Sequence, residues 1–315
     1  MGAGKLFAGA LAVLAAVLLV QGQSTFSGTP LGLDLYMPAP DDNPLTAEKV
    51  ALGRKLFFDT RLSRNQTVAC ASCHDLKHAF TDGKPLSEGV FGRRGTRSAP
   101  TLVNRGYGGS QFWDGRARSL EEQVLKPIQD PNEMDMTLEE VSSRIGLTRQ
   151  EISRSLSSYL RSIRSGNSAF DRHVNGDPQA LTEEQRRGLQ VFRVKGNCNA
   201  CHVGPNFTDE RFHNTGVSWR EERWLDEGRF GVTMRPEDRG AFKTPTLREV
   251  ALTAPYMHDG SLATLEDVVE FYNRGGKSNP HLDSEIQPLH LSEEEKRALV
   301  SFLRALSGEI IEGAH

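Results

Sequence analysis

Two short stretches decide the fold: Cys70-Ala-Ser-Cys73-His74 and Cys198-Asn-Ala-Cys201-His202. The chain has 4 cysteines, and all of them lie in these two Cys-x-x-Cys-His windows. Two thiols at this spacing can add to the two vinyl groups of one haem, and the adjacent histidine then lies beneath the iron as its proximal ligand. The sequence therefore predicts two covalently bound c-type haems.

Disulfides and zinc are the alternatives for these cysteines. In an exported chain the cysteines could form two bridges, but the histidine after each pair would then have no role. A zinc ion shared between the motifs would need a Cys₄ or Cys₂His₂ set, which the long separation does not forbid. Because each motif places a histidine directly after its two thiols, haem attachment is the favoured interpretation.

The N-terminal residues are typical of an exported protein. Lys5 precedes an apolar run from Leu6 to Val20, and small and polar residues follow. This pattern predicts a secretory signal peptide over residues 1–22 and an N-terminal extension over 23–44. The alternative is a membrane anchor, but the run is shorter than the roughly 20 apolar residues of a full span. We therefore expect a periplasmic protein with no membrane span after cleavage.

The composition excludes some classes of partner. Lysine and arginine total 38 and aspartate and glutamate 41, so the formal net charge is −3. This balance gives no electrostatic case for a nucleic acid or a bulk membrane surface as a partner. The 30 glycines and 15 prolines favour a fold with long loops.

The two haem segments share their flanking sequence. Each motif follows a Leu-Thr-x-Glu stretch and a Gly-x-x-x-Phe stretch, and each precedes a Phe-Thr-Asp stretch. Farther on, Pro-Thr-Leu precedes Asp-Gly at the same offset in both copies. Such an internal repeat predicts two tandem c-type cytochrome domains. We place the boundaries at residues 45–165 for the first haem domain, 166–180 for a linker, 181–290 for the second haem domain and 291–315 for a C-terminal helix that packs back on a haem domain.

The expected secondary structure is mainly α, with long loops wrapping the two haems. Ser119 and Thr264 each have an acidic residue three positions on, which is typical of an N-cap with a capping box. Val124 and Leu125 are expected to continue the helix that follows Ser119. No stretch has a convincing strand pattern. Other helical patterns cover residues 45–58, 139–165, 181–192 and 293–306.

The two repeats differ at positions that could carry function. Two cofactors with different surroundings predict a division of labour between the haems. In the register of the repeat, Trp113 lies opposite His258, Gln123 opposite Val268, and Tyr272 opposite Pro127.

Several segments in a fixed order carry a resemblance to a known family. They are Cys70–Phe80, Ser98-Ala-Pro-Thr, Gln111-Phe-Trp-Asp-Gly-Arg-Ala, Leu120-Glu-Glu-Gln123, Pro127-Ile-Gln, Glu133-Met134, Arg239–Leu247 and Ala254-Pro-Tyr-Met-His-Asp-Gly260. Together they resemble the bacterial di-haem cytochrome c peroxidase/MauG superfamily, over essentially residues 45–305.

The resemblance implies unequal roles for the two haems. The haem on His74 would react with peroxide, with Gln123 and Glu133 on its distal side. The haem on His202 would transfer electrons, and Trp113 would lie between the two.

A calcium ion between the two domains is also implied by the resemblance. Backbone carbonyls at Thr253 and Pro255 would supply part of its ligand set. The family's side-chain ligand is usually asparagine, and this chain has Ser98 at the matching position.

Two departures indicate the MauG-like branch. The loop position that matches a distal histidine in peroxidases that need reductive activation is Val90, and valine cannot bind iron. The position that matches a methionine ligand of the second haem is Tyr272, so tyrosine is the expected axial ligand there. Met257 is the second candidate for that ligand, and Met234 and His258 are weaker ones.

The side chains themselves suit this chemistry. Glu133 can shuttle a proton between the two peroxide oxygens, and Gln123 can orient peroxide by hydrogen bonding. Trp113 offers an aromatic step between the irons. A phenolate from Tyr272 donates charge and should lower the reduction potential relative to methionine. The alternatives are a packed aromatic for Trp113, a loop carboxylate for Glu133 and a core residue for Tyr272.

Three functions are therefore open. The first is a peroxide-using oxidase that oxidises Trp or Tyr on a partner protein. The second is a peroxidase that removes hydrogen peroxide with electrons from a small cytochrome c or a cupredoxin. The third is a non-catalytic di-haem electron carrier. Trp219 and Trp224 could be surface sites for electron transfer, although packing is the simpler interpretation.

Overall fold

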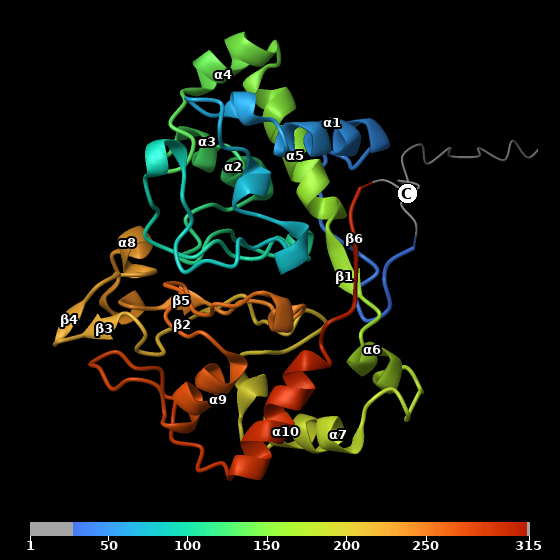
Figure 1. The fold of residues 1–315 in the computed structure, drawn as a ribbon, viewed down its shortest axis with the longest axis vertical. Helices are drawn as coiled ribbons and strands as arrows, with labels where there is room; N and C mark the ends of the chain where they lie inside the picture. The colour runs from blue at the N-terminus through green and yellow to red at the C-terminus, as the bar shows by residue number, and fades with distance from the viewer. Residues whose placement is uncertain (1–27, 314–315) are drawn as a thin grey trace, which may run out of the picture.

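The computed structural model describes residues 28–313, which form two lobes, one above the other (Figure 1). The upper lobe holds most of the blue-to-green part of the chain, and the lower lobe holds the yellow-to-red part, except for the red C-terminal segment, which runs up beside the upper lobe. The predicted signal peptide over 1–22 lies outside the described residues. Across residues 28–313, none of the helices has the length and apolar character that crossing a membrane demands.

The upper lobe is built on the pairing of its first and last helices, α1 and α5. Gly53 lies at their crossing, where a Cβ atom would overlap the Ser155 carbonyl and approach the Tyr159 Cβ. The close approach of the two backbones therefore requires glycine at this position. The α-helices of this lobe are α1 (Ala47–Phe57), α2 (Leu120–Gln123), α3 (Lys126–Gln129), α4 (Leu138–Ile145) and α5 (Arg149–Ser162).

The lower lobe repeats this arrangement with α7 and α10. Gly188 lies at their crossing, where a Cβ atom would overlap the Ala298 carbonyl and approach the Phe302 Cβ. The described α-helices after α5 are α6 (Ala169–Val174), α7 (Glu183–Arg193), α8 (Phe230–Thr233), α9 (Leu265–Asn273) and α10 (Glu293–Arg304).

Each lobe has its own hydrophobic core with an aromatic cluster at its centre. In the upper core, Phe57 lies 6.2 Å from Phe80 and 5.0 Å from Tyr159 between ring centroids. In the lower core, Phe192 lies 6.2 Å from Phe207 and 5.3 Å from Phe302. The phenylalanines of the Gly-x-x-x-Phe and Phe-Thr-Asp stretches therefore meet in both lobes.

Strands are few and short, which departs from the expectation of none. They form three antiparallel pairs, of which β1 with β6 ties the end of α5 to the C-terminal segment, in the register Arg164↔Ile311. These pairs were missed because two or three residues are too few for an alternating pattern. The described strands are β1 (Arg164–Gly166), β2 (Phe212–His213), β3 (Trp219–Arg220), β4 (Arg223–Trp224), β5 (Phe242–Lys243) and β6 (Glu309–Ile311).

The long helix expected over 139–165 is wrong. Gly146 adopts a left-handed conformation with φ 72° and ends α4. Thr148 then begins α5, since its side chain accepts a hydrogen bond from the Glu151 amide and the Glu151 carboxylate bonds the Thr148 amide. A C-terminal glycine and a new capping box thus divide one periodic pattern into two helices.

The helix after Ser119 is also shorter than expected. Ser119 does cap α2, but the Glu122 carboxylate accepts from the Arg118 amide, so the capping box is not formed. The helix ends at Gln123, and α3 begins with Pro127 in its first turn. Thr264, in contrast, forms the predicted box with Asp267. Proline favours a new helix start and disfavours continuation of the old one.

Short 3₁₀ turns carry both haem motifs. The hydrogen bonds of a 3₁₀ turn join residues only three positions apart. Such a tight turn suits a loop that must hold two thiols and an imidazole close together. The turns are η1 (Thr60–Leu62), η2 (Cys70–Ser72), η3 (Leu76–His78), η4 (Val90–Gly92), η5 (Arg105–Tyr107), η6 (Cys198–Ala200), η7 (Pro236–Asp238) and η8 (Val250–Leu252).

Candidate di-haem site

Both motifs open on one cavity of about 660 Å³. His74 and Cys73 line it from the upper half of the chain, and Cys198, Cys201 and His202 line it from the lower half. Cys70 packs against the core of the upper lobe. The structure therefore brings two motifs that are far apart in sequence to the walls of the same space.

The two histidines are held in the same way. Nδ1 of His74 donates to the Phe80 carbonyl at 2.8 Å, and Nδ1 of His202 donates to the Phe207 carbonyl at 2.8 Å. Burial lowers the pKa of both imidazoles, so each is neutral. A neutral imidazole that donates from Nδ1 leaves Nε2 unprotonated and able to bind a metal.

The carbonyl partners are placed by an unusual backbone conformation. Phe80 has φ 62° and Phe207 has φ 52°, both in the left-handed region that bulky residues rarely adopt. This conformation turns each carbonyl toward the histidine while the ring stays in the core. Backbone strain of this kind collects at functional sites. The repeated Phe-Thr-Asp stretch was visible in the sequence, but its role as a carbonyl clamp was not.

The cysteines are free thiols in this structure. Burial raises the pKa of Cys70 to about 12, of Cys73 to about 11 and of Cys198 to about 12. Two thiols and one neutral imidazole in each half, around an apolar-walled cavity, fit a covalently attached haem in each half.

One cluster beside the second motif has metal-ligand spacing. The ligand atoms of Cys201, Asp209 and His213 lie within 4.8 Å of one another. The carboxylates of Asp209 and Asp283 accept hydrogen bonds from the His213 ring at 2.9 and 2.6 Å. Hydrogen bonds to Cys201 and to these carboxylates raise the pKa of His213 to about 10. Through these bonds His213 joins the segment that carries Asp209 to the loop that carries Asp283.

Three predicted site residues line the upper part of the cavity: Trp113, Gln123 and Glu133. Burial and, to a lesser degree, the neighbouring Asp130 carboxylate raise the pKa of Glu133 to about 7. At neutral pH this carboxyl is therefore divided between its acid and base forms, which suits proton transfer. Asp130 also lines the cavity, and its influence on Glu133 was not expected from the sequence.

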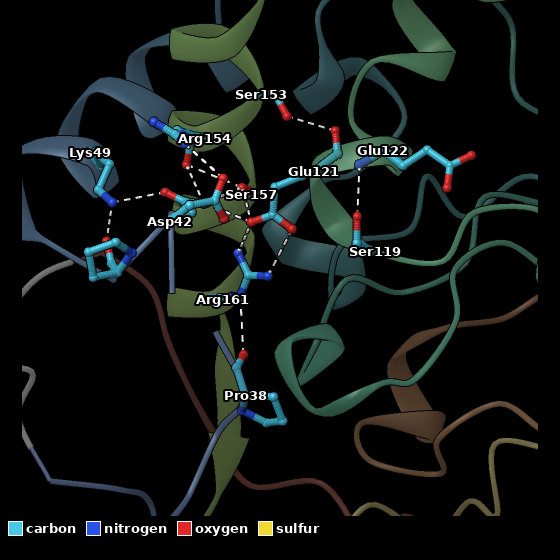
Figure 2. A network of polar contacts seen from close by, with 12 residues as sticks. Pro38, Asp42, Lys49, Ser119, Glu121, Glu122, Ser153, Arg154, Ser157 and Arg161 are labelled. Carbon is cyan, nitrogen blue, oxygen red and sulfur yellow. Dashed lines mark hydrogen bonds and ion pairs between the residues drawn. The ribbon is translucent and has the colours of Figure 1, made fainter. Parts of the chain in front are cut away.

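An ion-pair network around Glu121 fastens the short helix that ends at Gln123 (Figure 2). Glu121 on α2 accepts from Arg161 on α5 at 2.6 and 3.0 Å. Ser157 donates to the same carboxylate at 3.0 Å, and Ser153 donates to the Glu121 carbonyl at 2.7 Å. A bidentate and largely buried pair fixes both position and orientation, so the short helix that ends at Gln123 is fastened to the long helix of its lobe.

Trp113 connects the two halves of the chain. Its indole Nε1 donates to the Ser98 carbonyl at 2.9 Å, and the Ser98 amide donates to the His258 carbonyl at 2.7 Å. The Lys243 amide donates to the Trp113 carbonyl at 2.7 Å. Both the ring and the backbone of Trp113 are therefore held against residues of the lower half.

Comparison with known proteins agrees with this geometry. The family described as di-haem cytochrome c peroxidase matches residues 47–150. The methylamine utilization protein MauG of Methylorubrum extorquens is 38% identical over 291 residues, which cover 87% of this chain and 82% of that protein. The chain belongs to the di-haem cytochrome c peroxidase family. It is thus a haem-dependent oxidoreductase of a family with two haem c groups.

Further relatives refine the position of this peroxidase. Cytochrome c551 peroxidase of Pseudomonas aeruginosa is 32% identical over 304 residues, with 87% of this chain and 85% of that protein covered. The crystal structure of a MauG-like protein associated with microbial copper homeostasis superposes with a TM-score of 0.80 at 33% identity, covering 88% and 95% of the two chains. MauG and MauG-like relatives support the MauG-like branch.

Val90 does not face the cavity of this peroxidase. Its side chain is fully buried in the upper core, and its amide donates to the Glu133 carbonyl at 2.9 Å. Gly89 lies against the backbone of Asn132 and Glu133, where a Cβ atom would overlap. Arg93 donates to the Pro131 carbonyl at 2.7 Å. The loop that could have carried a distal ligand is therefore fastened to the segment that carries Glu133.

The structure distinguishes the candidates for the second axial ligand by whether they line the cavity. Tyr272 and Met257 both line the cavity, as does His258. Burial raises the pKa of the Tyr272 phenol. His258 stacks on Phe242 with centroids 3.6 Å apart. Met234 is 70% exposed and does not line the cavity, so it is excluded as a ligand.

The remaining predicted residues take two different places. Ser98, Thr253 and Pro255 line the same cavity, as a shared site would require. Trp219 and Trp224 do not line it; they pack on each other across β3 and β4 with centroids 4.6 Å apart.

Proposed function

We propose that this protein uses hydrogen peroxide at a haem held by His74 and relays oxidising equivalents through Trp113 to a second haem held by His202 and Tyr272. We propose further that the final reductant is a Trp or Tyr side chain of a partner protein. When bound, the haems supply the redox chemistry with peroxide. The observation that carries the proposal is the burial of Val90 in the core, away from the cavity, because it leaves this loop without a group that could block the first haem.

Glu133 would move the proton that peroxide cleavage requires. Its carboxyl lines the cavity with a pKa near 7, so it can accept a proton from one peroxide oxygen and return it to the other. Gln123 presents an amide that can donate to peroxide and orient it. The network of Glu121 and Arg161 supports this role, because it fixes the turn that carries Gln123.

Trp113 would be the step between the two halves. Its indole is fixed by the Ser98 carbonyl and its backbone by the Lys243 amide. A residue that is fixed through both its ring and its backbone moves little when its charge changes. This rigidity favours rapid electron transfer in either direction.

Tyr272 would complete the second haem. The phenol lines the cavity, and tyrosine is a known axial ligand of haem iron. A negatively charged ligand stabilises the oxidised state, which suits a site that holds oxidising equivalents. Met257 is the second candidate for this role.

A second activity, reduction of peroxide with electrons from a small cytochrome c or a cupredoxin, is favoured by one observation. Relatives of this chain include proteins named cytochrome c peroxidase, such as the one from Pseudomonas aeruginosa. The third possibility, a non-catalytic carrier, is set aside because the family consists of enzymes.

We also propose two tandem haem domains over 45–165 and 181–290, arisen by duplication. The matching glycine crossings, aromatic clusters and histidine clamps of the two lobes support it. The predicted export sequence supports a periplasmic location. A calcium ion at Thr253 and Pro255 remains part of the proposal, with Ser98 in place of asparagine.

Electron paramagnetic resonance of the oxidised protein tests this assignment. The proposal predicts one high-spin and one low-spin ferric haem, because only the second has two protein ligands. Two low-spin haems would contradict it and would favour an electron carrier or an enzyme that needs reductive activation.

A further inference from the structure

Lys243 is a buried cation for which the mechanism above uses only the backbone amide. Its side chain is 8% exposed and lines the cavity. It lies on β5, and the segment after it packs along the loop that follows the second haem motif. There Thr208 donates to the Thr244 carbonyl at 2.7 Å and Thr246 donates to the Asn206 carbonyl at 2.6 Å. Lys243 therefore belongs to the wall of the second haem.

The charges around Lys243 do not balance. Among the described residues its ion-pair partner is Glu210, with Nζ and Oε2 3.6 Å apart, which is too long for a hydrogen bond. Glu210 is already held by Arg105 at 2.7 and 3.2 Å. Two cations thus share one carboxylate. Lys243 and Arg105 line the cavity, whereas Glu210 does not.

A neighbouring cluster of ion pairs has equal numbers of cations and carboxylates. Arg97 pairs with Asp114 at 2.6 Å and with Asp226 at 2.7 Å, and Arg116 pairs with Asp114 at 3.1 Å. Two cations there meet two carboxylates. Lys243 and Arg105, in contrast, share the single carboxylate of Glu210, so this group has one anion fewer than it has cations.

A buried ammonium without a full partner is costly, and it is stabilised by an anion in the same space. Burial, together with the nearby Arg105 charge, lowers the pKa of Lys243 to about 7. The cavity is where the haems fit, and the anionic groups of a haem are its two propionates. A propionate carboxylate would therefore supply the missing charge.

We propose that the ammonium of Lys243 binds a propionate of the haem held by His202 and so joins the edge of that haem to the backbone of Trp113. The Lys243 amide already donates to the Trp113 carbonyl at 2.7 Å. One residue thus holds the aromatic step through its backbone and the haem through its side chain. The inference rests on the second haem occupying the cavity, and not on the identity of its axial ligand or of the substrate.

Redox titration of the holoprotein tests this inference with three variants. Lys243→Met removes the charge and keeps the bulk, Lys243→Arg keeps the charge, and Lys277→Met removes an exposed lysine of the same half as the control. A positive charge beside a propionate stabilises the reduced haem. Lys243→Met should lower the ferrous/ferric equilibrium constant of the His202 haem on the order of tenfold, while the other two variants stay close to the wild type.

Resonance Raman spectra of the same samples provide the second measurement. The propionate bending band of one haem should shift in Lys243→Met and move differently in Lys243→Arg. If Lys243→Met does not assemble with haem, the propionate band of Lys243→Arg decides, because it should differ from that of the wild type although the potential stays close to it. An unchanged potential with an unchanged band, or a change confined to the His74 haem, would overturn the inference. Because neither measurement uses peroxide, failure of the proposed activity leaves this test intact.

Discussion

The indole Nε1 of Trp113 donates a hydrogen bond of 2.9 Å to the carbonyl of Ser98. The Ser98 amide in turn donates to the His258 carbonyl at 2.7 Å. The backbone of one residue, Ser98, thus lies between the ring of Trp113 and the segment that occupies the same place in the second repeat. The only tryptophan that lines the cavity, among residues 28–313, is therefore fixed at the boundary of the two halves.

Replacement of Trp113 by phenylalanine should interrupt the relay. The smaller ring keeps an aromatic side chain in the cavity but loses the bond to Ser98. Transfer of oxidising equivalents between the two haems should slow at least about tenfold, which corresponds to ~1.4 kcal/mol of barrier. Stopped-flow spectra that resolve the two haems measure this rate.

Trp219→Phe is the matched control, because Trp219 packs on Trp224 and does not line the cavity. Equal rates in both variants and the wild type would argue that electrons pass by another route.

Replacement of Glu133 by glutamine should slow the reaction with peroxide by about 10²–10⁴-fold, the usual worth of a positioned acid or base. In the wild type the rate should rise as pH increases through about 7, since the carboxyl there changes from acid to base. Glu133→Gln should lack this rise. A pH profile that survives the substitution would assign the ionisation to another group.

Glu133→Gln should also differ from the wild type in its free energy of unfolding. This measurement reports on folding independently of the reaction with peroxide. The pKa of Glu133 rises from 4.5 in the unfolded chain to about 7 in the folded one. Stability from this group is therefore complete below pH 4.5 and is lost between 4.5 and 7. Glu133→Gln should be more stable than the wild type at pH 8, by at most ~3 kcal/mol, and not at pH 4. Thermal unfolding at the two pH values measures the difference.

Replacement of Tyr272 by methionine should raise the reduction potential of the second haem. Thioether ligation favours ferrous iron relative to phenolate ligation. The control is Tyr256→Phe, since Tyr256 also lines the cavity but its hydroxyl donates to the Val250 carbonyl at 3.0 Å. Equal potentials in Tyr272→Met and the wild type would transfer the ligand role to Met257.

Replacement of Gly188 by alanine should destabilise the lower lobe. The added Cβ would meet the Ala298 carbonyl, so α7 and α10 must separate, at a cost of about 1–3 kcal/mol. Gly231→Ala in α8 meets open space and should be neutral or slightly stabilising. Urea unfolding of both variants compares them. A Gly188→Ala protein as stable as the wild type would contradict the close crossing.

The sequence predicted the parts of the site that depend on spacing. One such part is the spacing of the thiols and the histidine within each motif, and another is the set of offsets in the repeat. Both are properties of the sequence that do not depend on how the two halves pack together. They led to His74 and His202, whereas Tyr272 came from the resemblance to the family; all three line the common cavity.

Other parts depend on contacts between distant segments and could not be read from one chain. The orientation of Val90 into the core is set by the backbone of Glu133. The unbalanced charge of Lys243 follows from Arg105, which lies in the other half of the chain. The breaks at Gly146 and Pro127 were visible as residues, but the helical pattern around them outweighed their effect in the prediction.

Addition of hydrogen peroxide to the fully oxidised protein tests the central claim most directly. The loop that carries Val90 is fastened to Glu133 and offers no ligand to the first haem. The account predicts an immediate change in the spectra of both haems without prior reduction. A protein that reacts with peroxide only after the second haem has been reduced would contradict it.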